Sequence, residues 1–205
     1  MTCCPRAPLG RTLLEIVRAG RRAAPRDVPL RLSLLHRQMH EFSLLQGAGS
    51  LPLPYDTERA DAGVDSFERR AAAAGPDSAA FARSLTGEAS GLALLRAVFG
   101  NSPFLAHAFL EEMDFAESVV MRGPDGPFDE VVASIAASDG ASKQSLMRTL
   151  RLARRRVALA AGLADIAGFW PLAEVSQALS RFADAAVGAA VRFLIEEAKA
   201  AGDLV

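Results

Sequence analysis

Two matched apolar stripes in the last sixty residues constrain the fold of this chain more than any other feature. In the first stripe, apolar residues alternate at spacings of four and three: Leu146, Leu150, Ala153, Val157, Ala160, Ala164 and Ala167. In the second stripe the spacing is the same: Leu172, Val175, Leu179, Phe182, Ala186, Ala189 and Phe193. Only Gly168-Phe169-Trp170-Pro171 separates them. This pattern predicts a long antiparallel αα-hairpin over about 143–167 and 171–200.

The rest of the chain after residue 50 also predicts helices, so the expected fold class is all-α with no sheet. Half of the 205 residues are hydrophobic, but there is one Tyr and one Trp, so alanine and leucine supply most of the apolar surface. These residues favour helices over strands. The sequence predicts further helices at 57–74 with Thr57 as cap, 78–86, 88–99, 103–121 and 128–137.

Three short segments predict helix boundaries. In Gly100-Asn101-Ser102-Pro103, Gly100 suits the left-handed position past a helix end, Ser102 suits an N-cap and Pro103 suits a first turn. The run 123–127, Gly-Pro-Asp-Gly-Pro, predicts a turn, and Ser142 predicts another N-cap. In the helix over 103–121, Phe104 and Phe115 are expected on the apolar side.

Residues 1–50 differ from residues 51–205 and are expected to lie outside the helical domain. They hold eight arginines against three acidic residues, a net charge of +5, and four prolines. A transit peptide, a loosely ordered basic arm, or translated upstream sequence with Met39 as the true start would each have this composition. The third interpretation is favoured, because the weak helical patterns in this segment commit to no fold.

Charge and cysteine content exclude several classes of function. A net charge of −1 gives no general case for binding nucleic acid or an anionic membrane. The two cysteines, Cys3 and Cys4, are adjacent, so they provide neither a disulfide framework nor a CxxC metal pair. No apolar run approaches the roughly 18 residues that span a bilayer. These features predict a soluble chain of a reducing compartment.

No group of residues predicts a complete active site. His36 and His40 have the spacing of two metal ligands on a helix, but Arg37 replaces the glutamate of the metalloprotease motif and no third ligand is near. His107 stands alone and predicts a packed or partly exposed side chain. An acidic group on the helix over 103–121 predicts a solvated face rather than catalytic carboxylates. Its members are Glu111, Glu112, Asp114 and Glu117.

One dense basic cluster lies on the first helix of the hairpin: Arg148, Arg151, Arg154, Arg155 and Arg156. Arg148, Arg151 and Arg155 share a face and are the candidates for contact with a phosphate or an acidic partner. A solvated stripe with intramolecular ion pairs is the favoured alternative, because no aromatic residues interleave with the arginines to stack on bases.

Four strings, in order, resemble the bifunctional glutamine synthetase adenylyltransferase/adenylyl-removing enzymes, most closely those of alphaproteobacteria. The strings are 99–105 (FGNSPFL), 146–156 (LMRTLRLARRR), 164–172 (ADIAGFWPL) and 179–185 (LSRFADA). The resemblance covers about 51–205, and 53–56 (LPYD) is similar to the start of the family's homology. Gly100, Asn101, Ser102, Pro103, Trp170 and Pro171 are therefore interpreted as structural residues of a family motif.

The resemblance implies an enzyme that adds AMP to glutamine synthetase and removes it, under direction from the PII signal protein. It also implies that each nucleotidyltransferase core of the family holds the ATP triphosphate at a Gly-rich helix start and Mg²⁺ through an Asp-x-Asp pair. None of the twelve aspartates of this chain stands two residues from another, so no catalytic, cofactor or metal residue is carried over. The expected identity is an N-terminal helical region, from a shortened reading frame or a piece of a longer protein, that is inactive alone.

Two expectations follow for the isolated chain. The hairpin should expose apolar surface, because in the intact enzyme it is expected to pack on the missing nucleotidyltransferase core. The alternative function is a stand-alone helical binding module that uses the Arg148, Arg151 and Arg155 face for an acidic partner or nucleic acid.

Overall fold

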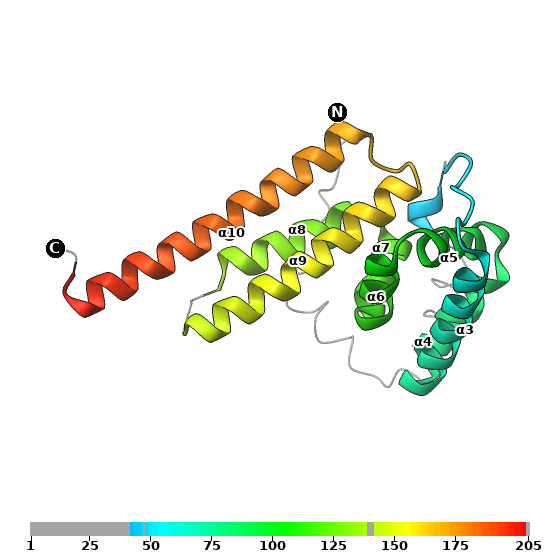
Figure 1. The fold of residues 1–205 in the computed structure, drawn as a ribbon, viewed down its shortest axis with the longest axis horizontal. Coiled ribbons are helices and arrows are strands. Elements are labelled where there is room, and N and C mark those ends of the chain that lie inside the picture. Colours follow the sequence, from blue (N-terminus) through cyan, green and yellow to red (C-terminus); the bar gives the residue numbers. More distant parts are fainter. Residues whose placement is uncertain (1–41, 47, 139–141, 204–205) are drawn as a thin grey trace, which may run out of the picture. The chain divides into compact units, whose positions relative to one another are not determined.

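The computed structural model describes residues 42–46, 48–138 and 142–203, all within one compact unit (Figure 1). These residues form eight α-helices and a short 3-10 helix, and they contain no strand, which confirms the all-α prediction. His36, His40, Met39 and the cysteines lie outside the described residues, as does most of the predicted basic segment. Within the described part of that segment, Leu44 of the 3-10 helix Ser43–Leu45 is buried, and this helix packs on α7 (Met113–Arg122).

Helices α3 (Thr57–Ala74), α4 (Pro76–Gly87) and α5 (Ala89–Asn101) pack against one another. The cap of α3 is Asp56 rather than Thr57: the Asp56 carboxylate accepts a hydrogen bond of 2.8 Å from the Arg59 backbone N–H. Phe67 lies edge-on to the Phe81 and Phe109 rings, with centroids 6.1 and 5.3 Å away. These aromatic contacts join α3 and α4 to α6 (Pro103–Glu111).

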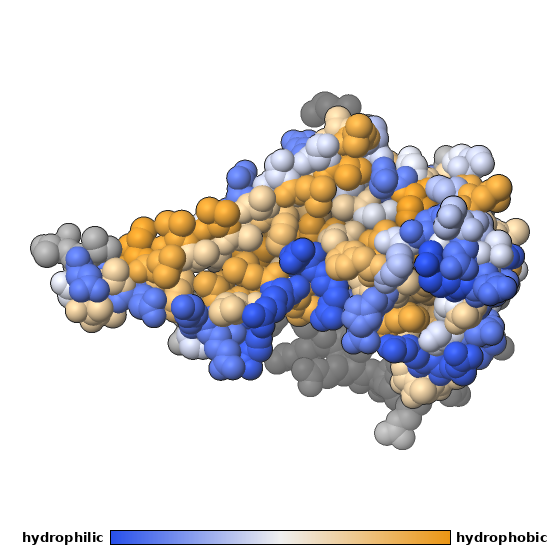
Figure 2. Space-filling model, in the orientation of Figure 1, coloured by the Kyte–Doolittle hydropathy of each residue, from blue (hydrophilic) through white to orange (hydrophobic). Residues whose placement is uncertain are grey.

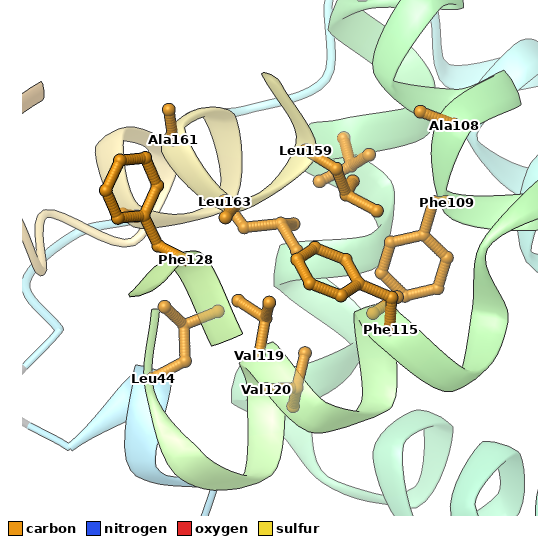
Figure 3. Packing of buried hydrophobic residues seen from close by; sticks show 14 of the residues in the cluster. Leu44, Ala108, Phe109, Phe115, Val119, Val120, Phe128, Leu159, Ala161 and Leu163 are labelled. Carbon is orange, nitrogen blue, oxygen red and sulfur yellow. The ribbon is translucent and has the colours of Figure 1, made fainter. Parts of the chain in front are cut away.

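The prediction of one helix over 103–121 is wrong, because the chain breaks at Glu112 (φ −119°, ψ 46°) into α6 and α7. Phe109 and Phe115 are six positions apart and would lie on different faces of a continuous helix. The break allows both to be buried (Figure 3). Phe104, predicted on the apolar side, is instead 53% exposed.

Helix α8 (Asp125–Ala136) begins earlier than predicted and takes in most of the expected turn at 123–127. Among residues 123–127 only Gly123 has a positive φ, 82°, and Asp125 is already helical. Pro127 fits inside the first turn because a proline there lacks only an N–H that has no partner within the helix. Phe128 on α8 packs into the core beside Leu163 of α9 (Figure 3).

The predicted hairpin is confirmed as α9 (Lys143–Ile166) and α10 (Leu172–Ala201), which run antiparallel in Figure 1. Ser142 caps α9 as predicted, accepting a hydrogen bond of 3.1 Å from the Ser145 N–H. At the connecting turn, Gly168 has a φ of 66°, and the Phe169 and Trp170 N–H groups donate to the Ala164 carbonyl.

The two helices of the hairpin differ in burial. The predicted stripe of α9 is buried or half-buried throughout, whereas α10 contains only two buried residues, Ala178 and Ala189. Leu172 and Leu179 were predicted on the inward stripe, but they are 76% and 44% exposed. Helix α10 packs on both α8 and α9.

Candidate interaction surfaces

A buried carboxylate anchors α9 to the break between α6 and α7. Glu112 is 8% exposed; its Oε2 accepts a hydrogen bond of 2.9 Å from Arg156 Nε, and its Oε1 forms an ion pair of 2.9 Å with Arg155 Nη2. The Arg156 guanidinium also lies 5.4 Å from the centre of the Phe115 ring. The prediction that Glu112 belongs to a solvated acidic face is therefore wrong, because the break turns this carboxylate toward α9.

The arginine face is divided by this contact. Arg155 is only partly exposed and is held by Glu112, whereas Arg148, Arg151 and Arg154 are exposed. Within the described part of the chain, none of these three exposed arginines makes an ion pair. From Lys143 to Ala164 there is no acidic residue, so this side of α9 is uniformly cationic. Contact of this face with a partner stays a prediction.

The Gly100–Pro103 motif fastens the segment that precedes α3. Asn101 donates to the Leu53 carbonyl at 3.1 Å and accepts from the Tyr55 N–H at 2.8 Å. Ser102 caps α6 as predicted, accepting from the Leu105 N–H at 3.2 Å, and Pro103 occupies the first turn.

Gly100 plays a different part from the one predicted. It lies in the last turn of α5 and does not have a positive φ, so the prediction of a left-handed residue is wrong. A Cβ atom at this position would lie 2.4 Å from the Pro54 Cβ. The glycine is needed because the two backbones approach closely.

The turn of the hairpin is fixed to α8 through Trp170. Its indole N–H donates to an oxygen of Asp125 at 2.8 Å, and its ring meets Phe128 edge-on with centroids 5.7 Å apart. Pro171 is the N-cap residue of α10. A hollow of about 240 Å³ lies beside this contact, and Arg181, which bonds to Asp129, forms part of its wall.

A larger hollow of about 440 Å³ lies between α8 and α9. Hydroxyl groups line both sides: Ser134 of α8 and Ser138 just after it on one side, and Ser145 and Thr149 of α9 on the other. The lining contains neither histidine nor cysteine. These groups can donate and accept hydrogen bonds, and the one carboxylate of the lining, Glu130, is paired with Arg122.

The titratable residues on α6 form a surface contact rather than a catalytic pair. Glu111 accepts a hydrogen bond of 3.1 Å from Arg70, and this hydrogen bond lowers the pKa of the Glu111 carboxyl. Desolvation opposes the lowering of the pKa, and electrostatic interaction with His107, Arg70 and Arg155 adds to it. His107 is exposed. Among the described residues, no three His, Cys, Asp or Glu side chains form a group that could hold a metal ion.

An apolar surface remains open on α10. Its exposed members are Leu172, Leu179, Val187, Val191, Leu194 and Ile195. Figure 2 shows this surface as an orange band along α10 with blue side chains below it. Within the described residues, no helix is long and apolar enough to cross a membrane.

The structure therefore defines an all-helical region held by two polar clamps, namely the contacts of Glu112 with Arg155 and Arg156 and of Trp170 with Asp125. Its terminal hairpin has an open apolar face and a cationic face. The family model for glutamate-ammonia ligase adenylyltransferase matches residues 92–203. That match covers more than half of the chain, from α5 through α10. The chain belongs to this family.

Several curated relatives carry the description "bifunctional glutamine synthetase adenylyltransferase/adenylyl-removing enzyme". The protein of Brucella suis is 31% identical over 152 residues, which is 73% of this chain and 15% of the relative. The protein of Mesorhizobium japonicum is 29% identical over 82% of this chain and 17% of its own length. That of Xanthobacter autotrophicus is 36% identical over 50% of this chain and 10% of the relative. No solved structure is significantly similar to the chain.

The chain thus spans about 15% of the length of the Brucella relative that it matches. Glu112, which holds Arg155 and Arg156, and Asp125, which holds the Trp170 indole, were not among the predicted site residues. For Asp125 a signal existed, because a buried tryptophan N–H needs an acceptor. For Glu112 there was none, since its neighbour Glu111 has the same charge and sequence context.

Proposed function

We propose that this chain is the N-terminal helical region of a glutamine synthetase adenylyltransferase/deadenylylase and that it supports the enzyme's catalytic core without transferring AMP by itself. The family match over α5–α10 carries the proposal. In this proposal ATP, Mg²⁺ and the reaction belong to the nucleotidyltransferase core, and glutamine synthetase and the PII signal protein are partners of the whole cytoplasmic enzyme.

Two further observations support a supporting role. Two of the strings that carry the family resemblance connect separate parts of the fold. Asn101 bonds to the segment before α3, and Trp170 bonds to Asp125 of α8. The Asp-x-Asp pair that would hold Mg²⁺ occurs nowhere in the sequence. The side chains present therefore do not fit a resident metal–nucleotide centre.

A chimera tests this role. Residues 51–205 would replace the matched segment of the Brucella suis enzyme, and the AMP added to and removed from glutamine synthetase would be measured. We expect the chimera to retain both activities, and a version without the segment to lose them or to be insoluble. Inactivity of a folded chimera would contradict the proposal.

The 205-residue chain would be assayed in parallel with glutamine synthetase, ATP and Mg²⁺. We expect no AMP transfer above background. Transfer or release of AMP by the purified chain would overturn the proposal that it does not catalyse alone. A chimera with the Trp170→Ala substitution shows what a disturbed helical region does to activity, because the substitution removes the hydrogen bond between Trp170 and Asp125. We expect it to be less active than the unsubstituted chimera.

The alternative, a stand-alone binding module, has one observation in its favour. Arg148 and Arg151 are exposed and make no ion pair with the described residues, although Arg155 is already held by Glu112. Binding of duplex DNA that falls steeply with salt and is lost on replacing Arg148 and Arg151 by Glu would support it. Salt-insensitive binding, or none, would contradict it.

A further inference from the structure

Helix α10 carries two apolar faces, and only one of them has a partner in the described structure. The inner face, which includes Val175, Ala178, Phe182 and Ala189, packs on the core. The outer face contains Val187, Val191 and Leu194 at spacings of four and three, and Ile195 beside them. Val187 is 62% exposed and Leu194 is 55% exposed. A helical period on an exposed face is typical of a surface that receives another helix.

The cationic side of α9 runs beside this outer face. Because α9 and α10 are antiparallel about the turn at 168–170, residues equally far from the turn lie at the same level. Arg151 is therefore level with Val187, and Arg154 lies within one turn of that level. Met147 is exposed and lies one turn before Arg151 in α9, at the level of Val191. Figure 2 shows the orange band of α10 and blue side chains at the position of α9 from the same side of the molecule, so a ligand on the α9–α10 surface meets both apolar and cationic groups.

We propose that the α9–α10 surface, defined by Met147, Arg151, Arg154, Val187, Val191 and Leu194, docks an acidic amphipathic helix from the catalytic core of the full-length enzyme. This inference rests on the proposed function, because it takes the occupant from the part of the relatives that this chain does not match. Its apolar side covers α10 and its carboxylates face the arginines. The open stripe from Leu179 to Ile195 is about 24 Å long, which matches a partner helix of about 16 residues.

Two considerations favour this occupant over a second copy of the chain. Antiparallel pairing of two α10 helices about the midpoint between Val187 and Leu194 sets Asp184 of one copy level with Glu197 of the other, so like charges meet. The α9 faces of both copies are also cationic. In contrast, a core joined to this region in one polypeptide has a high effective concentration at the surface, so a moderate intrinsic affinity is sufficient.

The chemistry of the surface can be tested with two synthetic 18-residue amphipathic peptides. One places Glu beside a Leu/Ala stripe, and the other replaces each Glu by Lys. Fluorescence anisotropy would measure their binding to the 205-residue chain at low and high salt. We expect the Glu peptide to bind, more weakly at high salt, and the Lys peptide not to bind.

Substitutions locate the binding site. The R151E/R154E and V187D/L194D variants should each weaken binding of the Glu peptide by about tenfold or more. The matched controls R83E, an exposed arginine on α4, and L53D, an 88% exposed leucine, should bind like the unmodified chain. The R151E/R154E variant should gain binding to the Lys peptide, a result that misfolding cannot produce. Equal binding of both peptides, or equal loss in R83E, would refute the inference.

A thiol probe tests the source of the helix. Reaction with a maleimide would be followed by mass spectrometry of the peptide that carries position 191, so that Cys3 and Cys4 do not contribute. Val191→Cys should react rapidly in the 205-residue chain and at least about tenfold more slowly in the Brucella chimera, because a docked helix covers it. Leu53→Cys should react rapidly in both. The R151E/R154E substitution should restore the reaction at Val191→Cys in the chimera.

The outcomes separate this inference from the proposed function. A chimera that transfers AMP while Val191→Cys reacts freely refutes the docking and leaves the proposed function standing. An inactive chimera in which Val191→Cys is protected refutes the proposed function alone. If sedimentation shows a dimer of the 205-residue chain in which Val191→Cys is protected, the occupant is a second copy and the inference is wrong.

Discussion

Replacing Glu112 by Gln is the sharpest perturbation of the interior of this fold. Gln keeps the shape of the side chain but removes the negative charge that pairs with the Arg155 and Arg156 guanidinium groups, each at 2.9 Å. The substitution leaves Arg155 and Arg156 facing a neutral amide that has one acceptor oxygen in place of two. The contact between the α6–α7 break and α9 should weaken as a result.

The magnitude follows from the exposure of the partners. Removing one member of a fully buried ion pair costs about 3–5 kcal/mol. Glu112 is 8% exposed, but Arg155 and Arg156 are 36% and 37% exposed, so water compensates part of their lost pairing. We expect the free energy of unfolding to fall by about 2–3 kcal/mol. For a folded unit of this size the midpoint of thermal unfolding should fall by about 5–10 °C.

Circular dichroism during heating and urea titration would measure the change. Glu111→Gln is the matched control, because the Glu111 carboxylate forms an ion pair with Arg70 at the surface and its loss should change the free energy of unfolding little. A Glu112→Gln variant as stable as Glu111→Gln would refute the conclusion that the buried clamp stabilises the fold.

Two other predictions follow from the structure. Gly100→Ala should lower the free energy of unfolding, measured by urea titration, by about 1–3 kcal/mol, because the new Cβ would lie 2.4 Å from the Pro54 Cβ. Gly87→Ala is the control, because no atom lies within 4 Å of a Cβ at that position. Equal effects of the two substitutions would contradict the close-approach argument. The hydrogen bond from Arg70 lowers the pKa of the Glu111 carboxyl. The stability that this contact adds should therefore be fully present above the carboxyl's unfolded pKa and be lost as the pH falls through the lower folded pKa. An NMR titration of the Glu111 carboxyl should show the lowered pKa, and a pKa that Arg70→Ala leaves unchanged would refute the assigned cause.

The sequence predicted the helices wherever a long periodic stripe was bounded by a residue with one dominant local role. Ser102 and Ser142 cap helices as expected, and the hairpin ends agree within one or two residues. Such features depend on neighbours a few positions apart, so they can be interpreted without the fold. The family resemblance was likewise carried by local strings and is supported by the family match over 92–203.

Predictions failed where long-range packing decides the conformation. The break at Glu112 exists because α9 supplies two guanidinium groups 43 and 44 positions away, which no pattern within 103–121 encodes. Gly100 lies within α5, and a glycine is needed there because Pro54 approaches it from another part of the chain. In both cases the local rule was sound, but a contact between distant segments outweighed it.

By itself, the sequence therefore determined the fold class, the terminal hairpin and the family, since each depends on local periodicity or on short strings. Tertiary structure alone decided which charges are buried and which apolar stripe stays open. It turned Glu112 inward, engaged Arg155 and left Arg151 exposed. It also placed Val187 and Leu194 on a face of α10 that no described helix covers, because burial depends on which neighbours surround a residue in space.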